Sequence, residues 1–352
     1  MSDTKCILMR KQLMVTERGK VAPCCNFKKS IPLDTYEQEA EEYAKLLDAG
    51  VKLDECSVCW ETERDGLTSV RQSGNQSAKH FEGDGITSLD IRIHNKCNLA
   101  CNMCHPNFST LWAKLKNKEI NNFIPQTHLD KVSELLSNVR KISLQGGEPF
   151  YGDEYVNFVD GLQSKHQIEL DTFTNVVTVN LDAISRWSKE LKSLRVNASV
   201  DGIGESFEYI RWPAKWSKFE RNAKKVYEII GGNINFFYTV QAANINSILP
   251  FLKWRNENCP NSRMVFTTVV HNDEVTYKGL TAAEKQQFIN SKKEILSLVN
   301  HDPEKDVWYN REYNDLMSLF NLVENVDIDE TIIQKRKDFD QYTIELREKH
   351  RE

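Results

Sequence analysis

From residue 86 to about residue 270, short apolar runs alternate with longer stretches whose apolar residues recur at helical spacing. Such runs have the length of buried strands, and the stretches between them fit amphipathic helices. We predict strands at residues 86–93, 139–145, 168–175, 194–201, 234–241 and 263–270. Helices are predicted over residues 181–193, 215–230 and 247–257, and another begins near Tyr151. Alternating strands and helices form parallel sheets with right-handed crossovers, so the predicted fold is α/β, a partial (β/α)6 TIM-like barrel.

The segments on either side of this repeat have a different pattern. Residues 1–80 contain a short strand-like run at 12–15 and a helix over 35–50, which ends at Gly50 as a C-terminal cap. Beyond residue 280, helices are predicted over 281–300 and 331–350, with little strand content. We therefore predict three domains: a small N-terminal domain (1–80), the barrel (81–275) and a helical C-terminal extension (276–352).

Composition and charge narrow the class of protein. Of 352 residues, 40% are hydrophobic and 28% are charged, which is typical of a soluble protein. The formal net charge of −5 argues against a nucleic-acid partner, since such proteins usually have a basic face. The N-terminus has no apolar run of the kind found in secretory signals, and no stretch approaches the roughly 18 apolar residues of a membrane span. A cytoplasmic protein without a membrane partner is expected.

Eight of the nine cysteines lie within the first 104 residues. Cys97, Cys101 and Cys104 form a C-x-x-x-C-x-x-C loop directly after the first barrel strand, at the end of a barrel that normally holds the active site. A zinc site completed by His94 or His105 is one interpretation. Structural zinc usually has four protein ligands in paired C-x-x-C units, so the loop fits it poorly. Thiolates also bind iron–sulfur clusters.

This loop resembles the signature of the radical S-adenosylmethionine (radical SAM) enzymes, which follows their first strand. The resemblance implies that the three cysteines hold a 4Fe–4S cluster whose open iron chelates S-adenosylmethionine. A reductant such as flavodoxin or ferredoxin would supply the electron that releases a 5′-deoxyadenosyl radical, which then abstracts a substrate hydrogen. Met103 stands where many members have an aromatic residue near the adenine, and its polarizable side chain can pack on a flat base.

The second strand ends in a G-G-E-P motif, residues 146–149, which is also found in this family. The glycines Gly146 and Gly147 let the backbone approach a ligand closely, and Glu148 can accept hydrogen bonds from an ammonium group. By the resemblance, this is the amino group of S-adenosylmethionine. Taken alone, the motif is only a turn before a helix.

Polar residues at other strand ends extend the resemblance. Ser199 and Asp201 follow the fourth strand, where the family places contacts to the ribose or the methionine carboxylate, and Arg211 is a candidate partner for that carboxylate. A polar strand end and a surface arginine would look the same in the sequence. Asn175 ends the third strand where relatives often read T-N-G, but Val176 replaces the glycine. Further candidates at the fifth strand are Gln241 and Asn244.

The N-terminal cysteines and the spaced Gly19 resemble the auxiliary-cluster modules called SPASM and Twitch. In the family these modules usually follow the barrel, whereas here the segment precedes it. The resemblance implies a Twitch-like domain over residues 1–80 with a second 4Fe–4S cluster, and Cys25 is a rival to Cys24. Zinc bound by the same thiolates is the alternative. The predicted ligands are Cys6, Cys24, Cys56 and Cys59.

The sequence therefore predicts a radical SAM enzyme, with no catalytic side chain identified beyond the cofactor ligands. Modules of the Twitch type often accompany peptide modification, so the expected substrate is a peptide or protein side chain. A small-molecule or nucleotide-derived substrate is the alternative within the family. A non-catalytic iron–sulfur or zinc protein is the alternative of another class, but it would not need the G-G-E-P motif or the polar strand ends.

Overall fold

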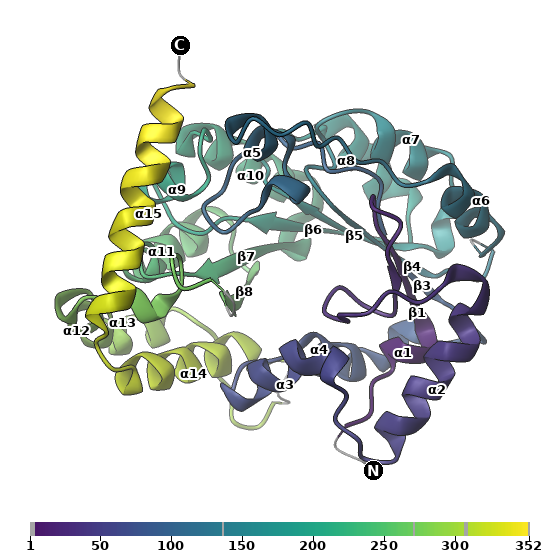
Figure 1. Cartoon of the computed structure of the whole chain (residues 1–352), viewed down its shortest axis with the longest axis horizontal. Helices are drawn as coiled ribbons and strands as arrows, with labels where there is room; N and C mark the ends of the chain where they lie inside the picture. Colours follow the sequence, from purple (N-terminus) through teal and green to yellow (C-terminus); the bar gives the residue numbers. More distant parts are fainter. Residues whose placement is uncertain (1–3, 136, 270–271, 306–308, 351–352) are drawn as a thin grey trace. The chain divides into compact units, whose positions relative to one another are not determined.

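The computed structural model describes residues 4–135, 137–269, 272–305 and 309–350. The chain forms two compact units. Unit 1 consists of Met1–Lys96, Asn121–Phe173 and Asp182–Arg195, and unit 2 of Cys97–Ile120, Thr174–Leu181 and Val196–Glu352. Both are built from parallel strands and helices (Figure 1), so the predicted α/β fold with a mostly parallel sheet is confirmed.

In unit 1 the strands are β1 (Gln12–Val15), β2 (Val21–Ala22), β3 (Ser88–Arg92), β4 (Lys141–Gln145) and β5 (Glu169–Thr174). β1 pairs antiparallel with β2 and parallel with β3, with Met14 opposite Asp90. β3, β4 and β5 then follow in parallel. Residues 1–80 thus contribute a strand to the same sheet as the start of the predicted barrel, and the three predicted domains stay a prediction.

Alternation along these strands separates an apolar face from a polar one. Leu89 and Ile91 of β3 and Leu144 of β4 are buried on the apolar face. On the opposite face, Gln145 donates to Asp90 Oδ2 at 3.1 Å and accepts from Arg92 at 3.2 Å. These polar side chains therefore hydrogen-bond to one another.

The helices of unit 1 are α1 (Leu8–Lys11), α2 (Tyr36–Asp48), α3 (Ser57–Arg64), α4 (Val70–Gln76), α6 (Gln126–Leu135), α7 (Glu154–Asp160) and α8 (Leu181–Glu190). In Figure 1, α6 and α7 lie on one side of β3 and β4. Trp187 of α8 is fully buried, stacks on Phe150 at 6.0 Å between ring centroids, and donates to Asp160 of α7. These contacts hold α7 and α8 to one core.

In unit 2 the parallel strands are β6 (Ser193–Ser199), β7 (Ile234–Val240) and β8 (Arg263–Thr268). The helices α10 (Trp216–Ile230) and α11 (Ile248–Asn258) pack on them. Aromatic rings fill this core: Phe236 of β7 lies 5.3 Å from Phe251 and 6.5 Å from Phe219. Val270, the last residue of the sixth predicted strand, lies outside the described residues.

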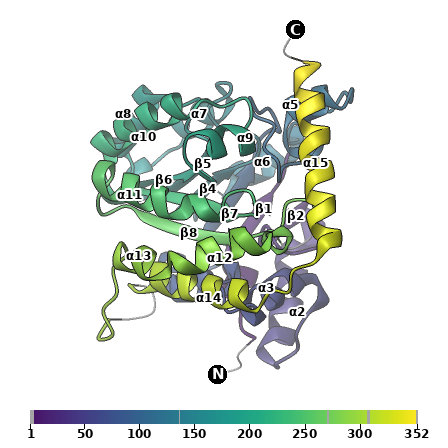
Figure 2. The same cartoon turned by 90° about the vertical axis from the view of Figure 1, so that its left-hand side faces the viewer.

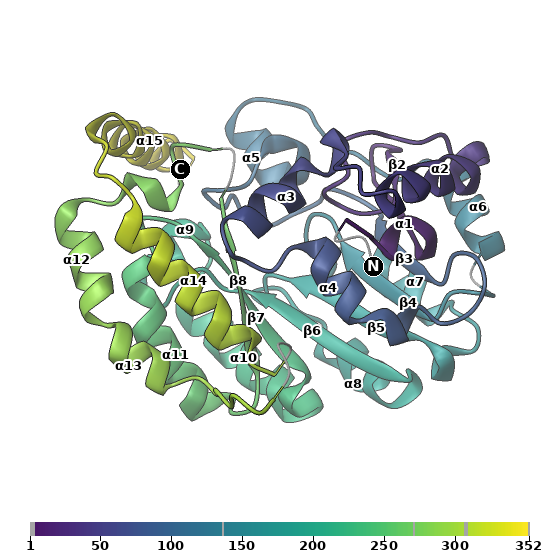
Figure 3. The same ribbon diagram turned by 90° about the horizontal axis from the view of Figure 1, so that it is seen from below.

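The remaining helices of unit 2 are α5 (Thr110–Leu115), α9 (Glu205–Ile210), α12 (Ala282–Asn290), α13 (Lys292–Ser297), α14 (Arg311–Asn325) and α15 (Glu330–Glu348). Figure 3 shows α12, α13 and α14 lying together, and Phe288 of α12 stacks on Phe320 of α14 at 4.4 Å. The helix predicted over 281–300 is interrupted at Ser291, and α14 was not predicted. No helix in the described ranges is long and apolar enough to cross a membrane.

Candidate cofactor site

The cysteine loop begins at Cys97 in unit 2 and runs into α5, whose first turn holds it. Cys97 N–H donates to Thr110 Oγ1 at 3.1 Å, and Ser109 Oγ donates to Leu99 O at 2.6 Å. Trp112 Nε1 donates to Cys101 O at 2.8 Å. These bonds use the loop's backbone, so they fix its path without using the cysteine sulfurs.

The segment after α9 fixes the loop from another direction. Ala100 N–H donates to Trp212 O at 2.7 Å, and Asn102 N–H donates to Ile210 O at 2.8 Å. Ala100 and Asn102, on either side of Cys101, are therefore held by two residues that follow each other closely in the chain, Ile210 and Trp212. Met103, the next residue, is half-buried on the same loop.

Arg211 lies between a cysteine and a carboxylate. Its Nη1 is 3.8 Å from Cys101 Sγ, and its Nη2 is 2.6 Å from Asp201 Oδ2. Asp201 follows β6, is fully buried, and also accepts the Thr239 N–H at 2.6 Å. Burial raises the pKa of the Asp201 carboxyl, and the Arg211 charge opposes that rise. Arg211 is itself only 8% exposed, so it is not the surface arginine of the plainer interpretation.

The same guanidinium acts on the cysteine. Burial raises the pKa of the Cys101 thiol, while Arg211 lowers it. Burial also raises the pKa of Cys104, to about 12. Metal binding requires thiolates, and a buried cation next to Cys101 favours the deprotonated form that a cluster needs.

Asn175 ties the end of β5 to the cysteine loop. Its Nδ2 donates to Asn98 Oδ1 at 2.8 Å, and its Oδ1 accepts the Val177 N–H at 2.9 Å. Val176 has a φ of 59°, the left-handed region that favours glycine. The backbone thus retains the conformation that the T-N-G pattern provides, although a β-branched residue occupies it. Ser199, the other predicted contact, is half-buried at the end of β6.

The G-G-E-P turn lies in unit 1, against the chain that leads to the first cysteine. Gly147 N–H donates to His94 O at 3.1 Å, and Glu148 N–H donates to Lys96 O at 2.7 Å. A Cβ at Gly147 would lie 2.1 Å from Lys96 O, and one at Gly146 would lie 2.8 Å from His94 O. The close approach that the glycines permit is therefore to the protein's own backbone. Glu148 is buried beneath this turn and accepts the Phe150 N–H at 3.2 Å.

The two histidines considered for a zinc site have other contacts. His94 is fully buried, with its Nε2 3.5 Å from Glu154 and its ring edge-on to Tyr155. Burial lowers its pKa. His105 is exposed, and its Nδ1 accepts the Asn107 N–H at 3.2 Å. Across the described ranges, no three His, Cys, Asp or Glu side chains converge as they would around one metal ion.

The N-terminal cysteines are far apart in the sequence but interact electrostatically in unit 1. Burial raises the pKa of Cys6 to about 11 and that of Cys56 to about 12, and the charge of Cys59 adds to both increases. Burial likewise raises the pKa of Cys24, with further contributions from Cys25, Cys6 and Cys59. Nearby thiolates repel each other, so a bound cation would favour deprotonation of these thiols.

Cys25 has a different principal neighbour. Burial raises its pKa to about 11, and the largest charge effect after burial comes from Asp90 of β3, opposed by Arg92. Cys24 has Cys25, Cys6 and Cys59 as its charged neighbours, and Cys59 also acts on Cys25. The choice of Cys24 over Cys25 as the ligand therefore stays a prediction.

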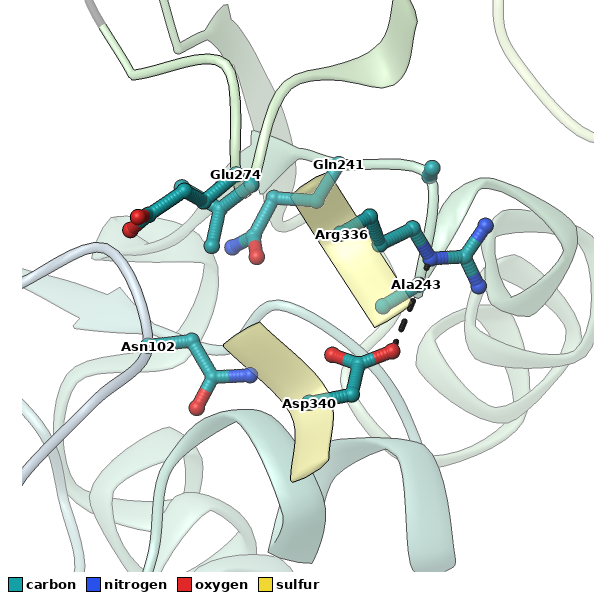
Figure 4. Close-up of a pocket in the computed structure, with 8 residues that line it drawn as sticks. Asn102, Gln241, Ala243, Glu274, Arg336 and Asp340 are labelled. Atoms are coloured by element: carbon teal, nitrogen blue, oxygen red, sulfur yellow. Dashed lines mark ion pairs between the residues drawn. The ribbon is translucent and has the colours of Figure 1, made fainter. Parts of the chain in front are cut away.

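A small polar cavity opens beside the cysteine loop within unit 2 (Figure 4). Asn102 of the loop lines it together with Gln241 of the β7 end, Glu274 and the α15 residues Arg336 and Asp340. Gln241 is 1% exposed, and within the described residues its side-chain amide has no hydrogen-bond partner. Figure 4 shows this amide pointing into the cavity. Asn244, the neighbouring candidate, instead accepts the Gln241 N–H at 2.8 Å and so shapes the turn.

Sequence reasoning missed two contributors to the loop, Asn102 and Arg347. Arg347 lies on α15 and donates to Ala100 O at 3.1 Å and to Asn102 Oδ1 at 2.6 Å. A polar stripe on that helix could have indicated the role of Arg347, because Arg336, Asp340 and Arg347 recur at helical spacing.

Comparison with known proteins agrees with these motifs. Residues 91–254 match the family model of the Radical SAM superfamily. An uncharacterised protein of Methanocaldococcus jannaschii is 29% identical over 176 residues, which is 48% of this chain and 57% of that protein. A probable GTP 3′,8-cyclase of Methanococcus maripaludis is 24% identical over 42% of this chain and 47% of its own length. The GTP 3′,8-cyclase of Clostridium perfringens is 26% identical over 61% of this chain and 65% of its own length.

Solved structures with similar chain folds include anSMEcpe with bound AdoMet, with a TM-score of 0.44 and 18% identity over 60% of each chain. Streptococcus suis SuiB bound to S-adenosylmethionine has a TM-score of 0.45 and 15% identity over 75% of this chain and 59% of that one. The chain spans about half the length of the first curated relatives it matches. The matched range, somewhat less than half of the chain, contains both the C-x-x-x-C-x-x-C loop and the G-G-E-P turn, and over these residues the chain is similar to the radical SAM superfamily.

Proposed function

We propose that the chain is a radical SAM enzyme whose cluster is held by Cys97, Cys101 and Cys104. The observation that carries the proposal is the buried Arg211 guanidinium, which contacts Cys101 Sγ and pairs with Asp201. When bound, a 4Fe–4S cluster and S-adenosylmethionine would supply the 5′-deoxyadenosyl radical that removes a substrate hydrogen.

The chain's own residues provide charge, position and exclusion of water. Arg211 favours the thiolate of Cys101, and Asp201 keeps that guanidinium in place. Within unit 1, the Glu148 carboxylate is a candidate acceptor for an ammonium group, and within unit 2, Ser199 and Asn175 are candidate acceptors at the strand ends. Burial of the loop strengthens each of these charge interactions, because they act in a medium of low dielectric constant.

The second part of the proposal is a closed auxiliary 4Fe–4S site formed by Cys6, Cys24, Cys56 and Cys59 in a Twitch-like N-terminal domain. Its support is the electrostatic interaction among these thiols, each of which interacts with at least one of the others. Four thiolates would fill the coordination of a cluster, so this site would transfer electrons or bind substrate without cleaving S-adenosylmethionine. Zinc is the alternative occupant.

For the substrate, we propose a peptide or protein side chain, because Twitch-type modules often accompany peptide modification in this family. A nucleotide is the second candidate, and it is supported by the curated relatives named GTP 3′,8-cyclase. A cytoplasmic flavodoxin or ferredoxin would be the reductant in either case.

The test is anaerobic reconstitution with iron and sulfide, followed by addition of S-adenosylmethionine and dithionite. We expect 5′-deoxyadenosine by mass spectrometry from the wild type and from Cys259→Ala, which removes the isolated cysteine at the end of α11. Cys101→Ala should form none. Absence of 5′-deoxyadenosine from the fully loaded wild type would overturn the proposal.

Two further measurements test the auxiliary cluster and the class of substrate. Iron analysis should give about eight irons per chain with two clusters and about four with one. GTP deuterated on the ribose tests the nucleotide substrate: transfer of deuterium into 5′-deoxyadenosine would favour it over a peptide.

A further inference from the structure

The last turns of α15 pack directly on the cysteine loop and on the helix that follows it. Leu346 contacts the buried cluster formed by Ala100, Trp112 and Leu115. His350 Nε2 lies 3.3 Å from Leu115 O. Figure 2 shows α5 beside the C-terminal half of α15. The end of this helix is therefore part of the structure that surrounds the loop.

Arg347 makes the specific contacts at this junction. Its Nη2 donates to Ala100 O and Asn102 Oδ1, and its Nη1 donates to Tyr209 O at 2.8 Å. Its guanidinium carbon is 5.6 Å from the Tyr209 ring centroid and 5.5 Å from that of Trp212. Arg347 is 4% exposed. Only a planar guanidinium can combine this fork of donors with stacking on rings, so lysine would not be equivalent.

These bonds place a second arginine around Cys101. Arg211 contacts its sulfur, while Arg347 holds the residues on both sides of it. The positive charge of Arg347 also acts on Cys101. Net charge and hydrogen bonding near the sulfurs set the reduction potential of iron–sulfur clusters. A buried cation at this position favours the reduced cluster, which has one more negative charge.

Other polar contacts of α15 fix the position of this helix along its axis, and with it the position of Arg347. Arg336, Asp340, Thr343 and Arg347 are four, three and four residues apart, so they share one face of the helix. Arg336 donates twice to Glu284 at 2.9 Å, and Asp340 accepts the Tyr209 hydroxyl. A one-residue slip would break all of these pairs, and the polar face therefore specifies a single position of the helix.

We propose that Arg347 is a positioning residue of the cluster site: through it, α15 holds the Cys101 segment in place and raises the reduction potential of the cluster. The effect on the reduction potential rests on the proposed function, because it requires a cluster at the loop. The immobilisation of the loop by Arg347 does not require a cluster, so an experiment can contradict one claim without the other.

The test compares Arg347→Gln, Arg347→Lys and the control Lys337→Gln, which removes a positive charge from an exposed position of the same helix. Redox titration followed by electron paramagnetic resonance measures the potential of the loop cluster in Cys56→Ala/Cys59→Ala protein. We expect Arg347→Gln to make reduction about tenfold less favourable, which is about 59 mV for one electron. Arg347→Lys keeps the charge and should shift the potential less, and Lys337→Gln should leave it unchanged.

Hydrogen exchange on the protein without cluster gives the second readout. Amides of residues 97–104 should exchange faster in both Arg347 variants and at the wild-type rate in Lys337→Gln. Asn102→Ala removes one acceptor while leaving α15 intact, and it should give an intermediate increase. An unchanged potential and unchanged exchange in Arg347→Gln, or equal changes in Lys337→Gln, would overturn the proposal. If the wild type binds no cluster while exchange responds as expected, the proposed function fails and the immobilisation stands.

Discussion

The two groups of cysteines in this chain differ in the arginine side chains that lie near them. The loop of unit 2 gathers its three cysteines within eight residues, and a buried arginine contacts one of them. The N-terminal group has four cysteines spread over residues 6–59, and the arginine that acts on two of them, Arg71, is paired with Glu63 at 2.7 Å. Arg71 lowers the pKa of Cys6 and Cys56 only as a minor effect.

This difference fits two kinds of site. Three thiolates leave one iron of a cluster without a protein ligand, and nearby cations and polar strand ends then serve the molecule that occupies it. Four thiolates complete the coordination, so no further partner is required at the metal. An open site and a closed site in one chain should therefore respond differently to the same kinds of substitution.

The largest expected effect separates the two cysteine groups directly. Cys97→Ala/Cys101→Ala should lower 5′-deoxyadenosine formation at least about 1000-fold and remove about four irons, since these thiolates are the proposed protein ligands of the cluster. Cys56→Ala/Cys59→Ala should remove the other four and leave uncoupled cleavage of S-adenosylmethionine in place. Iron analysis and mass spectrometry measure both. Loss of cleavage in both variants would show that the sites are not independent.

A second comparison lies within the N-terminal group. Cys24→Ala should lose about four of eight irons, whereas Cys25→Ala should keep them, because the principal charged neighbour of Cys25 is Asp90 and not the other thiols. Iron content and the visible absorption of the reconstituted proteins decide between them. The opposite result would make Cys25 the ligand and would place Cys24 outside the site.

The arginines beside the two groups should differ in their contribution to folding. Arg211→Gln leaves Asp201 buried and unpaired, which should lower the free energy of unfolding by about 3–5 kcal/mol. Arg71→Gln should cost about 1–3 kcal/mol, because the side chain of Glu63 keeps some contact with water. Urea denaturation of the cluster-free proteins measures both. The double variant Asp201→Asn/Arg211→Gln should regain part of the loss, and a full loss there would argue against the ion pair as the cause.

The smallest effect concerns a second buried carboxylate, in unit 1. Asp201 has an arginine at 2.6 Å, whereas the hydrogen-bond donor to Asp90 is Gln145 at 3.1 Å, with the charge of Arg92 and the thiol of Cys25 nearby. Burial raises the pKa of Asp90 from 3.8 to about 6. The native state therefore binds the proton more tightly than the unfolded chain does.

Stability should accordingly fall as pH rises from about 4 to about 6, and then level off, with at most about 3 kcal/mol lost. Asp90→Asn should remove this part of the pH dependence, so its advantage over the wild type should grow from pH 4 to pH 7. Urea denaturation at several pH values provides the measurement. An equal difference between the two proteins at all pH values would contradict a raised pKa.

Much of this architecture was predictable because it is encoded locally. The strands β3 to β8 follow from short apolar runs, and the cysteine loop follows from the spacing of three residues. The helix α14 could have been predicted as well, since its buried Leu316, Leu319, Phe320 and Val323 recur at helical spacing. Its absence from the prediction was an error of pattern recognition.

What the sequence did not predict depends on contacts between distant residues. The strand at residues 12–15 was predicted, but its parallel pairing with β3 joins positions 76 residues apart. The burial of Arg211 depends on Asp201 and on the loop that covers both, and neither partner is implied by spacing. Arg347 is an ordinary charged residue of an amphipathic helix until α15 docks, so its role becomes visible only in the folded chain.

The contacts of Arg347 also order events during protein synthesis. They join it to Ala100 and Asn102, 247 and 245 residues earlier in the chain. A ribosome adds about 5–20 residues per second, so the cysteine loop leaves it roughly 12–50 s before the arginine that holds the loop. During this interval the thiols are open to oxidation and to the wrong metal. If a cluster binds at the loop, we therefore expect its assembly to be complete only after α15 has left the ribosome and docked on Ala100 and Asn102.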